Sequence, residues 1–172
     1  QKIKIIVGGP EVTREDTPYI MNCNAIDIGC IGAGESTFIE IVEHCLNGKN
    51  DYRDIKGIFY RTNDGVRLTP EREPIKRFDD IPSPYLLGII NPEDYSEVWL
   101  ETSRGCVNKC SYCISSSVPL TSFSSERTYK EIKYLMNKNI GILRILDSDF
   151  IISPSFKNIC KWLKKFNSRE KV

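Results

Sequence analysis

Apolar and polar positions in the first third of the chain follow patterns that predict strands joined to a helix. A β-branched run over residues 2–7 ends at Gly8-Gly9-Pro10, a strand-breaking sequence, and residues 25–31 predict a second strand. Apolar residues then recur at helical spacing up to Gly48, which stands where a C-terminal helix cap belongs. The residues expected on the buried face of this helix are Phe38, Ile41, Val42, Cys45 and Leu46.

The middle of the chain predicts a β-hairpin followed by an extended connection. Residues 57–61 and 66–69 are typical of paired strands, and Asn63-Asp64-Gly65 between them is a tight-turn sequence. Residues 70–96 have little periodicity and contain five of the nine prolines, at positions 70, 74, 82, 84 and 92. We expect this stretch to be a linker between two domains.

Strands and helices alternate again in the last part of the chain. Residues 98–102 predict a strand that runs into Ser103-Arg104-Gly105-Cys106, and residues 142–146 predict another that ends at Asp147-Ser148-Asp149. A helix is expected after each strand, so the two strands should lie parallel with a right-handed crossover. We expect Trp99 to lie in the core.

The two helices of this part have recognisable starts and apolar faces. The first is expected to begin near Ser125 or Thr128, and Thr128 with Glu131 fits a capping box. The second opens at Ser153-Pro154, because proline suits the first turn of a helix. The residues expected to point inward are Tyr129, Ile132, Leu135 and Met136 in the first helix and Phe156, Ile159, Cys160 and Leu163 in the second.

Composition and charge are those of an ordinary globular protein, and they narrow the set of partners. The 172 residues carry a net charge of +1, so the chain has no general excess of positive charge that would attract nucleic acid or an anionic membrane. No apolar run approaches the roughly 20 residues needed to cross a bilayer, and the first residues do not form a signal peptide. We therefore expect a cytoplasmic protein with no membrane or nucleic-acid partner.

Seven cysteines in a chain without a secretory signal favour metal binding or redox chemistry over a disulfide framework. Cys106, Cys110 and Cys113 lie close together, and such a loop can hold three irons of a cubane cluster and leave the fourth iron open. A structural zinc site is an alternative that needs a fourth ligand, from His44 or a scattered cysteine, and a redox dithiol is another. The scattered cysteines, expected to be small buried apolar residues, are Cys23, Cys30, Cys45 and Cys160.

Residues 100–113 resemble the cluster loop of the radical S-adenosylmethionine superfamily, in the cysteine spacing and in the tyrosine before the last cysteine. The resemblance implies that Cys106, Cys110 and Cys113 ligate a 4Fe–4S cluster and that Tyr112 lies beside the adenine of S-adenosylmethionine. In that family the open iron binds S-adenosylmethionine, and the reduced cluster cleaves it to a 5′-deoxyadenosyl radical. The resemblance also implies an external electron donor such as flavodoxin or ferredoxin. Residues 142–150 resemble the second strand of that family's barrel.

Two turns in the first part resemble those of the cobalamin-binding domain that precedes the barrel in a large group of these enzymes. They lie in residues 7–11 and 31–38, and residues 55–61, 70–75 and 81–85 resemble the connection that follows. The resemblance implies cobalamin contact by Gly8, Gly9, Gly32 and Gly34, since glycine lets the backbone approach a flat ligand. The same glycines also fit ordinary turns of a Rossmann-like domain. Ala33 departs from the group, which usually has an acidic residue there, and His44 is expected at a helix surface.

The predicted fold is α/β, in three parts. Residues 1–69 are expected to be the C-terminal part of a Rossmann-like cobalamin-type domain, residues 70–96 a proline-rich linker, and residues 97–172 the start of a TIM-like radical barrel. Two βα units are visible where such a barrel needs about six, so we expect a piece of a longer enzyme that has no turnover alone. The whole enzyme would act on an unidentified small molecule, with methyl transfer through cobalamin as one outcome and methylthio transfer to nucleic acid as another. The alternative is a non-catalytic zinc-binding module.

Overall fold

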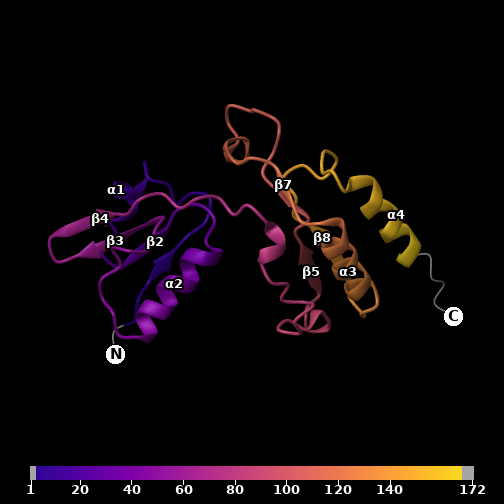
Figure 1. Ribbon diagram of the computed structural model, residues 1–172, viewed down its shortest axis with the longest axis horizontal. Helices are drawn as coiled ribbons and strands as arrows, with labels where there is room; N and C mark the ends of the chain where they lie inside the picture. The colour runs from indigo at the N-terminus through magenta and orange to yellow at the C-terminus, as the bar shows by residue number, and fades with distance from the viewer. Residues whose placement is uncertain (1–2, 168–172) are drawn as a thin grey trace. The chain divides into compact units, whose positions relative to one another are not determined.

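A four-stranded mixed sheet organises the first part of the chain (Figure 1). The computed structural model describes residues 3–167, and the chain divides into two units between Lys76 and Arg77. β1 is parallel to β2, and the β2–β3 and β3–β4 pairs are antiparallel. Both predicted strands of this part are present in shorter form, and residue 2 of the first lies outside the described residues. The strands, in sheet order, are β1 (Ile6–Val7), β2 (Ile28–Cys30), β3 (Ile58–Thr62) and β4 (Gly65–Leu68).

The helix α2 (Glu35–Leu46) packs on one face of this sheet. It ends as predicted, with Asn47 as its C-cap and Gly48 following at a φ of 68°. Phe38 and Leu46 are 51% and 81% exposed, so their predicted burial is wrong. The helix contacts the sheet through a narrow stripe around Ile41. Leu46 lies about 140° around the helix from Ile41 and points away from this stripe, while Phe38, about 60° from Ile41, lies at its margin. The buried residues of this core are Ile28, Cys30, Ile41, Tyr52, Ile55, Ile58 and Tyr60.

A second apolar cluster lies on the opposite face of the sheet, because successive strand residues point to opposite sides. Val12, Met21 and Phe59 form it, with partly buried neighbours that include Ile20 of the short helix α1 (Thr17–Ile20). Phe59 pairs with Gly29 of the neighbouring strand, and a Cβ on Gly29 would lie 2.0 Å from the Phe59 ring. The ring therefore occupies the space of the missing side chain.

The predicted hairpin is confirmed and is tied to the strand next to it. Thr62 pairs with Gly65, which leaves Asn63-Asp64 as the two-residue turn. The Arg61 guanidinium donates hydrogen bonds to the carbonyl oxygens of Met21 at 2.7 Å and Ile26 at 3.3 Å. These bonds join the hairpin to the segment that leads into β2.

Two parallel strands and two helices form the core of the second unit (Figure 1). β5 (Glu97–Leu100) and β8 (Ile142–Ile145) pair in parallel, as the alternation of strand and helix predicted. α3 (Ser125–Met136) and α4 (Phe156–Asn167) contact each other and pack on one face of the pair. No helix within residues 3–167 is long and apolar enough to cross a bilayer. The buried residues of this core are Val98, Leu100, Ile132, Leu135, Ile159 and Phe166.

Two residues predicted to lie in this core are exposed. Trp99 is 55% exposed, because its strand neighbours Val98 and Leu100 point toward the helices and Trp99 therefore points to the other side. Cys160 is exposed because it follows Ile159 by one helical position, and Ile159 lies at the centre of the buried face. Both errors concern which face of an element is covered.

The helix α3 begins one turn before the predicted capping box. Its N-cap is Ser124, whose hydroxyl accepts a hydrogen bond from the Arg127 amide at 3.1 Å, so the capping box at Thr128 is wrong. Thr128 and Glu131 are buried inside the helix instead. Glu131 accepts hydrogen bonds from Ser83 Oγ at 2.5 Å and from Arg127 Nη2 at 3.1 Å.

The division between the two units falls inside the predicted linker, and residues 77–96 belong to the second unit. They contain the short 3-10 turns η1 (Phe78–Asp80) and η2 (Pro92–Asp94). Asp79 accepts a hydrogen bond from the Ser124 amide at 2.9 Å, and hydrogen bonding from Ser124 lowers the pKa of Asp79. These contacts fasten the segment to the start of α3.

The packing of Phe59 on Gly29 gives a test of this fold. Replacing Gly29 by Ala should destabilise the first unit by about 3 kcal/mol, because the new methyl group overlaps the ring. Urea unfolding followed by circular dichroism measures the change. Gly8→Ala is the control, since a Cβ there would make an ordinary 3.6 Å contact with the Cys30 Cβ. In a Phe59→Ala background the cost of Gly29→Ala should largely disappear, and an unchanged cost would contradict the account.

Candidate metal centre

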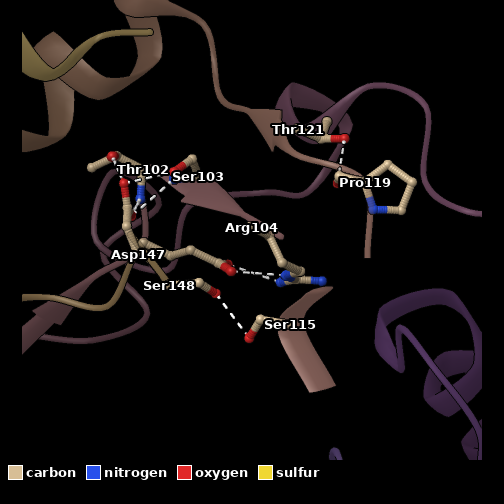
Figure 2. Close-up of polar contacts among 9 residues, drawn as sticks. Thr102, Ser103, Arg104, Ser115, Pro119, Thr121, Asp147 and Ser148 are labelled. Atoms are coloured by element: carbon tan, nitrogen blue, oxygen red, sulfur yellow. Dashed lines mark hydrogen bonds and ion pairs between the residues drawn. The ribbon is translucent and has the colours of Figure 1, made fainter. Parts of the chain in front are cut away.

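A two-residue ladder closes the base of the loop that carries the clustered cysteines. β6 (Ser103–Arg104) and β7 (Thr121–Ser122) pair antiparallel, with Ser103 opposite Ser122. The Cys106 amide donates a hydrogen bond to the carbonyl oxygen of Val118 at 3.2 Å. The loop therefore lies just beyond the carboxyl end of β5, and Figure 2 shows the polar contacts around its base.

Gly105 lies where the two ends of the loop approach each other most closely. Its φ is +85°, which side chains other than glycine rarely adopt. A Cβ on Gly105 would lie 2.5 Å from the carbonyl oxygens of both Val118 and Pro119. The sequence placed Gly105 in the cysteine motif but gave no reason for it, and the reason is the backbone thirteen and fourteen residues further on.

The three predicted ligands share this loop, with free and half-buried thiols. The Cys113 amide donates to the carbonyl oxygen of Cys110 at 3.1 Å, and the Asn108 amide donates to Cys106 Sγ at 3.4 Å. The 3-10 turn η3 (Ile114–Ser117) begins directly after the last cysteine. In the part of the chain that the structure describes, no three His, Cys, Asp or Glu side chains are arranged to hold a metal ion. The fold thus brings the three thiols onto one loop without closing them around a centre.

The donor set of the loop fits an iron–sulfur cluster with one open iron. Three thiols on one loop with a fixed base are the ligands that such a cluster requires. The scattered candidates for a fourth ligand have other surroundings: Cys30 is buried, and burial raises the pKa of its thiol. Cys45 Sγ lies 3.5 Å from the Tyr52 hydroxyl, and His44 Nδ1 lies 3.0 Å from the carbonyl oxygen of Glu40.

Two of the four scattered cysteines differ from the prediction. Cys30 is buried and Cys45 is half-buried, but Cys23 and Cys160 are exposed. Cys23 follows α1, where the chain turns at the surface before β2. The two exposed thiols lie outside the cysteine loop, so their substitution can serve as a control for substitution of the loop cysteines.

Tyr112 presents an aromatic ring to solvent at the loop, with its residue 90% exposed. Val107 and Ile114 are exposed apolar residues on the same loop. A ring with accessible faces can stack on a nucleobase. The predicted position of Tyr112 beside an adenine is therefore sterically open and stays a prediction.

Three polar residues that begin two positions after β8, Asp147, Ser148 and Asp149, each contact the cysteine segment. The Asp147 carboxylate accepts hydrogen bonds from Thr102 and Ser103, from both amides and both hydroxyls (Figure 2). Ser148 Oγ lies 3.3 Å from Ser115 Oγ, and Asn108 Nδ2 donates to Asp149 at 3.2 Å. The sequence placed Asp147 and Asp149 at the end of a strand and assigned them no role. The sequence did contain one signal for these contacts. The polar residues 147–149 follow a predicted strand, and that strand was expected to lie parallel to the strand that leads into the cysteine loop.

An ion pair lies next to this base. Arg104 donates two hydrogen bonds to the Glu101 carboxylate, at 2.7 and 2.8 Å, and its guanidinium lies 5.1 Å from the centroid of the Phe78 ring. Paired in this way, Arg104 is held in a defined geometry one residue before Gly105.

A second ion pair lies on the exposed face of the two-stranded sheet. Arg144 pairs with Glu97, and its hydrogen bond is the main cause that lowers the pKa of Glu97. Trp99 Nε1 also donates to Glu97, at 2.5 Å. This face of β5 and β8 is therefore mixed, since it carries the exposed apolar residues Trp99 and Ile142 beside the ion pair, while the opposite face is the apolar core.

The four predicted glycines of the first unit lie at one edge of its sheet. β1 and β2 are parallel, so the turns that follow them, with Gly8 and Gly9 after one strand and Gly32 and Gly34 after the other, leave at the same edge. A Cβ on Gly9, Gly32 or Gly34 would meet no atom within 4 Å. Gly34 is also the N-cap residue of α2, so backbone amide donors lie beside this open space.

No protein-family model matches this sequence. It is 28% identical over 164 residues to the cobalamin-dependent radical SAM methyltransferase TokK of Streptomyces tokunonensis, which covers 88% of this chain and 24% of that protein. It is 30% identical over 163 residues to the uncharacterized methyltransferase PH0819 of Pyrococcus horikoshii, which covers 89% of this chain and 35% of that protein. The chain therefore spans about a quarter to a third of the length of these relatives.

The fold has a counterpart among solved structures. The radical S-adenosylmethionine methyltransferase TsrM of Kitasatospora setae, with cobalamin and a [4Fe-4S] cluster bound, matches with a TM-score of 0.65. The match covers 94% of this chain and 33% of that one at 17% identity, so it establishes similarity of fold. The relative TokK is thus a cobalamin-dependent radical enzyme, and the resemblance stated from the cysteine motif is confirmed.

The close approach at Gly105 can be tested directly. Gly105→Ala should destabilise the second unit by about 3 kcal/mol, since it adds both an unfavourable φ and an overlap with two carbonyl oxygens. Urea unfolding measures the change. Gly88→Ala is the matched control, because Gly88 has a similar φ of +67° but open space around it, so only the cost of the backbone conformation, about 1 kcal/mol, is expected. Equal costs at the two positions would contradict the close approach.

Proposed function

We propose that this chain, whose homologues are cobalamin-dependent radical S-adenosylmethionine methyltransferases, is the part of such an enzyme that joins a cobalamin-binding domain to a radical barrel. The observation that carries the proposal is the three-cysteine loop at the carboxyl end of β5, beside the parallel strand β8. In βα folds, ligands bind at this edge of the sheet. The zinc-module alternative is not favoured, because the relative TokK is a radical enzyme.

In this proposal Cys106, Cys110 and Cys113 hold the 4Fe–4S cluster, and the open iron is the place for S-adenosylmethionine. The cluster, when bound and reduced by a donor such as flavodoxin or ferredoxin, supplies the electron that cleaves S-adenosylmethionine. The residues of the chain bind and orient the cluster and S-adenosylmethionine. Gly105 allows the base of the loop to close, and the exposed ring of Tyr112 stacks on the adenine.

The two units have separate roles in the proposed enzyme. The first unit is the end of a Rossmann-like cobalamin domain, with the turns of Gly8, Gly9, Gly32 and Gly34 directed to cobalamin across an open sheet edge. The second is the first two βα units of a TIM-like barrel. Methyl transfer to a small-molecule substrate is then an activity of the whole protein, to which this chain contributes the cluster ligands.

The cysteine assignment predicts a specific change in metal content. The chain, reconstituted anaerobically with iron and sulfide, should turn brown and bind about four irons and four sulfides. Alanine at any of Cys106, Cys110 or Cys113 should remove most of this iron, because three thiolates are the smallest set that holds the cluster. Iron and sulfide analysis with the visible spectrum measures it.

The exposed thiols outside the loop provide matched controls for this experiment. Cys23→Ala and Cys160→Ala each remove one free thiol, as the loop variants do, and they should keep the full iron content. Iron loss in these controls as large as in the loop variants would show nonspecific binding. One tightly bound zinc and no iron in the unmodified chain would contradict the proposed function.

The glycine turns predict cobalamin binding that a single side chain can block. Gly34→Leu should weaken binding of aquacobalamin at least about tenfold, because its side chain enters the open space beside the turn. Gly34 has an ordinary negative φ, so the variant is expected to fold. Asn47→Leu, at the other end of α2, is the control. Equal binding of both variants, measured by spectral titration, would place cobalamin elsewhere.

A further inference from the structure

We propose that Asp147 is a positioning residue for the cysteine loop, which it holds in register for cluster binding through Thr102 and Ser103. The inference rests on the proposed function, because it assigns a role within the same cluster site. Asp147 is not assigned as a cluster ligand, since within residues 3–167 its carboxylate bonds to Thr102 and Ser103 and to no cysteine. It acts through the two residues that lead into the base of the loop.

The two carboxylate oxygens of Asp147 accept different kinds of donor (Figure 2). Oδ1 accepts the backbone amides of Thr102 at 2.7 Å and Ser103 at 3.0 Å. Oδ2 accepts the hydroxyls of the same residues, at 2.5 Å for Thr102 and 2.7 Å for Ser103. Four donors thus converge on one charged acceptor, and hydrogen bonds to a charged group are about twice as strong as neutral ones.

Burial makes these four bonds hard to replace. Thr102 and Ser103 are only 1% and 2% exposed, so water has little access to their amides and hydroxyls. Without the carboxylate, these buried donors would lose their acceptor, and an unsatisfied buried polar group is costly. The backbone at this point is therefore fixed by a side chain that follows another strand, β8.

The same two residues control both ends of the loop. Ser103 pairs with Ser122 in the ladder at the base, and the carbonyl oxygen of Thr102 accepts the Phe123 amide at 3.1 Å. Gly105 and Cys106 follow after Arg104, in a backbone conformation that Val118 and Pro119 confine. A shift at Thr102 and Ser103 would therefore move the first ligand and the return of the loop together.

The neighbours of Asp147 do not duplicate this role. Ser148 hydrogen-bonds to Ser115 and Asp149 to Asn108, in each case between exposed groups. Such single surface contacts contribute little to position. Asp147 alone among the three reaches the residues at the base.

The experiment compares Asp147→Ala with Asp147→Asn in the full 172-residue chain. Asn keeps one carbonyl oxygen for the two amides, and its NH₂ group can donate to the two hydroxyls, so it should preserve the geometry without the charge. Glu93→Ala is the matched control. Glu93 is also a carboxylate that accepts a backbone amide, that of Asn139 at 3.1 Å, but at the opposite end of β8.

Two readouts are needed, of which one does not depend on the cluster. In the metal-free chain, hydrogen exchange should be at least about tenfold faster at the amides of Thr102, Ser103 and Cys106 in Asp147→Ala, and within about twofold of the unmodified chain in Asp147→Asn. After reconstitution, Asp147→Ala should hold less than half the iron of the unmodified chain. Asp147→Asn and Glu93→Ala should load fully, with an unchanged response of the reduced-cluster electron paramagnetic resonance signal to S-adenosylmethionine.

Each outcome decides the proposal. Full loading and unchanged exchange in Asp147→Ala would overturn it, as would equal losses in Asp147→Ala and Glu93→Ala, which indicate general destabilisation. If Asp147→Ala does not fold, Thr102→Val with Ser103→Ala removes the Oδ2 partners alone and should give intermediate exchange and loading. An unmodified chain that binds no iron would defeat the proposed function, while the exchange data would still decide whether Asp147 fixes the base.

Discussion

The parallel pairing of β5 with β8 is the constraint on which the arrangement of the second unit depends. Parallel strands end at the same edge of a sheet, so the residues after Leu100 and those after Ile145 must meet there. The alternation of buried and exposed residues on both strands fixes the register, and a slip of one residue would turn Asp147 to the other side of the sheet. The hydrophobic core beneath the strands therefore determines which polar group reaches the cysteine loop above them.

The first unit repeats this arrangement with a different kind of edge. There β1 and β2 are the parallel pair, and glycines rather than polar side chains follow them. One edge offers open space and backbone amides, which suits a large flat ligand, and the other offers side chains that clamp a loop. In both units the turns after two parallel strands lie at the same edge of the sheet. The residues in those turns decide whether the edge offers open space and backbone amides or polar side chains.

Most of what the sequence predicted correctly depends on neighbours along the chain, and most of what it missed depends on distant residues. The hairpin around Asn63-Asp64 and the cysteine loop follow from local spacing, and both were identified. The errors at Phe38, Leu46 and Trp99 concern which face is covered, and only the packed core decides that. The contacts of Asp147 could not be read from the sequence, because its partners lie 44 and 45 residues away.

The loop combines a fixed base with thiols that are not closed around a centre, and this combination suits a ligand that is assembled in place. Ordering a residue costs about 1–2 kcal/mol of conformational entropy, so a wholly free loop would oppose cluster binding strongly. The ladder, the contact at Gly105 and the clamp of Asp147 order the base during folding, when the core supplies the free energy. In the proposed function, only the segment between Cys106 and Cys113 would then have to rearrange to hold a cluster. A loop anchored in this way needs no preformed metal geometry, because the cluster itself can set the final positions of the three thiolates.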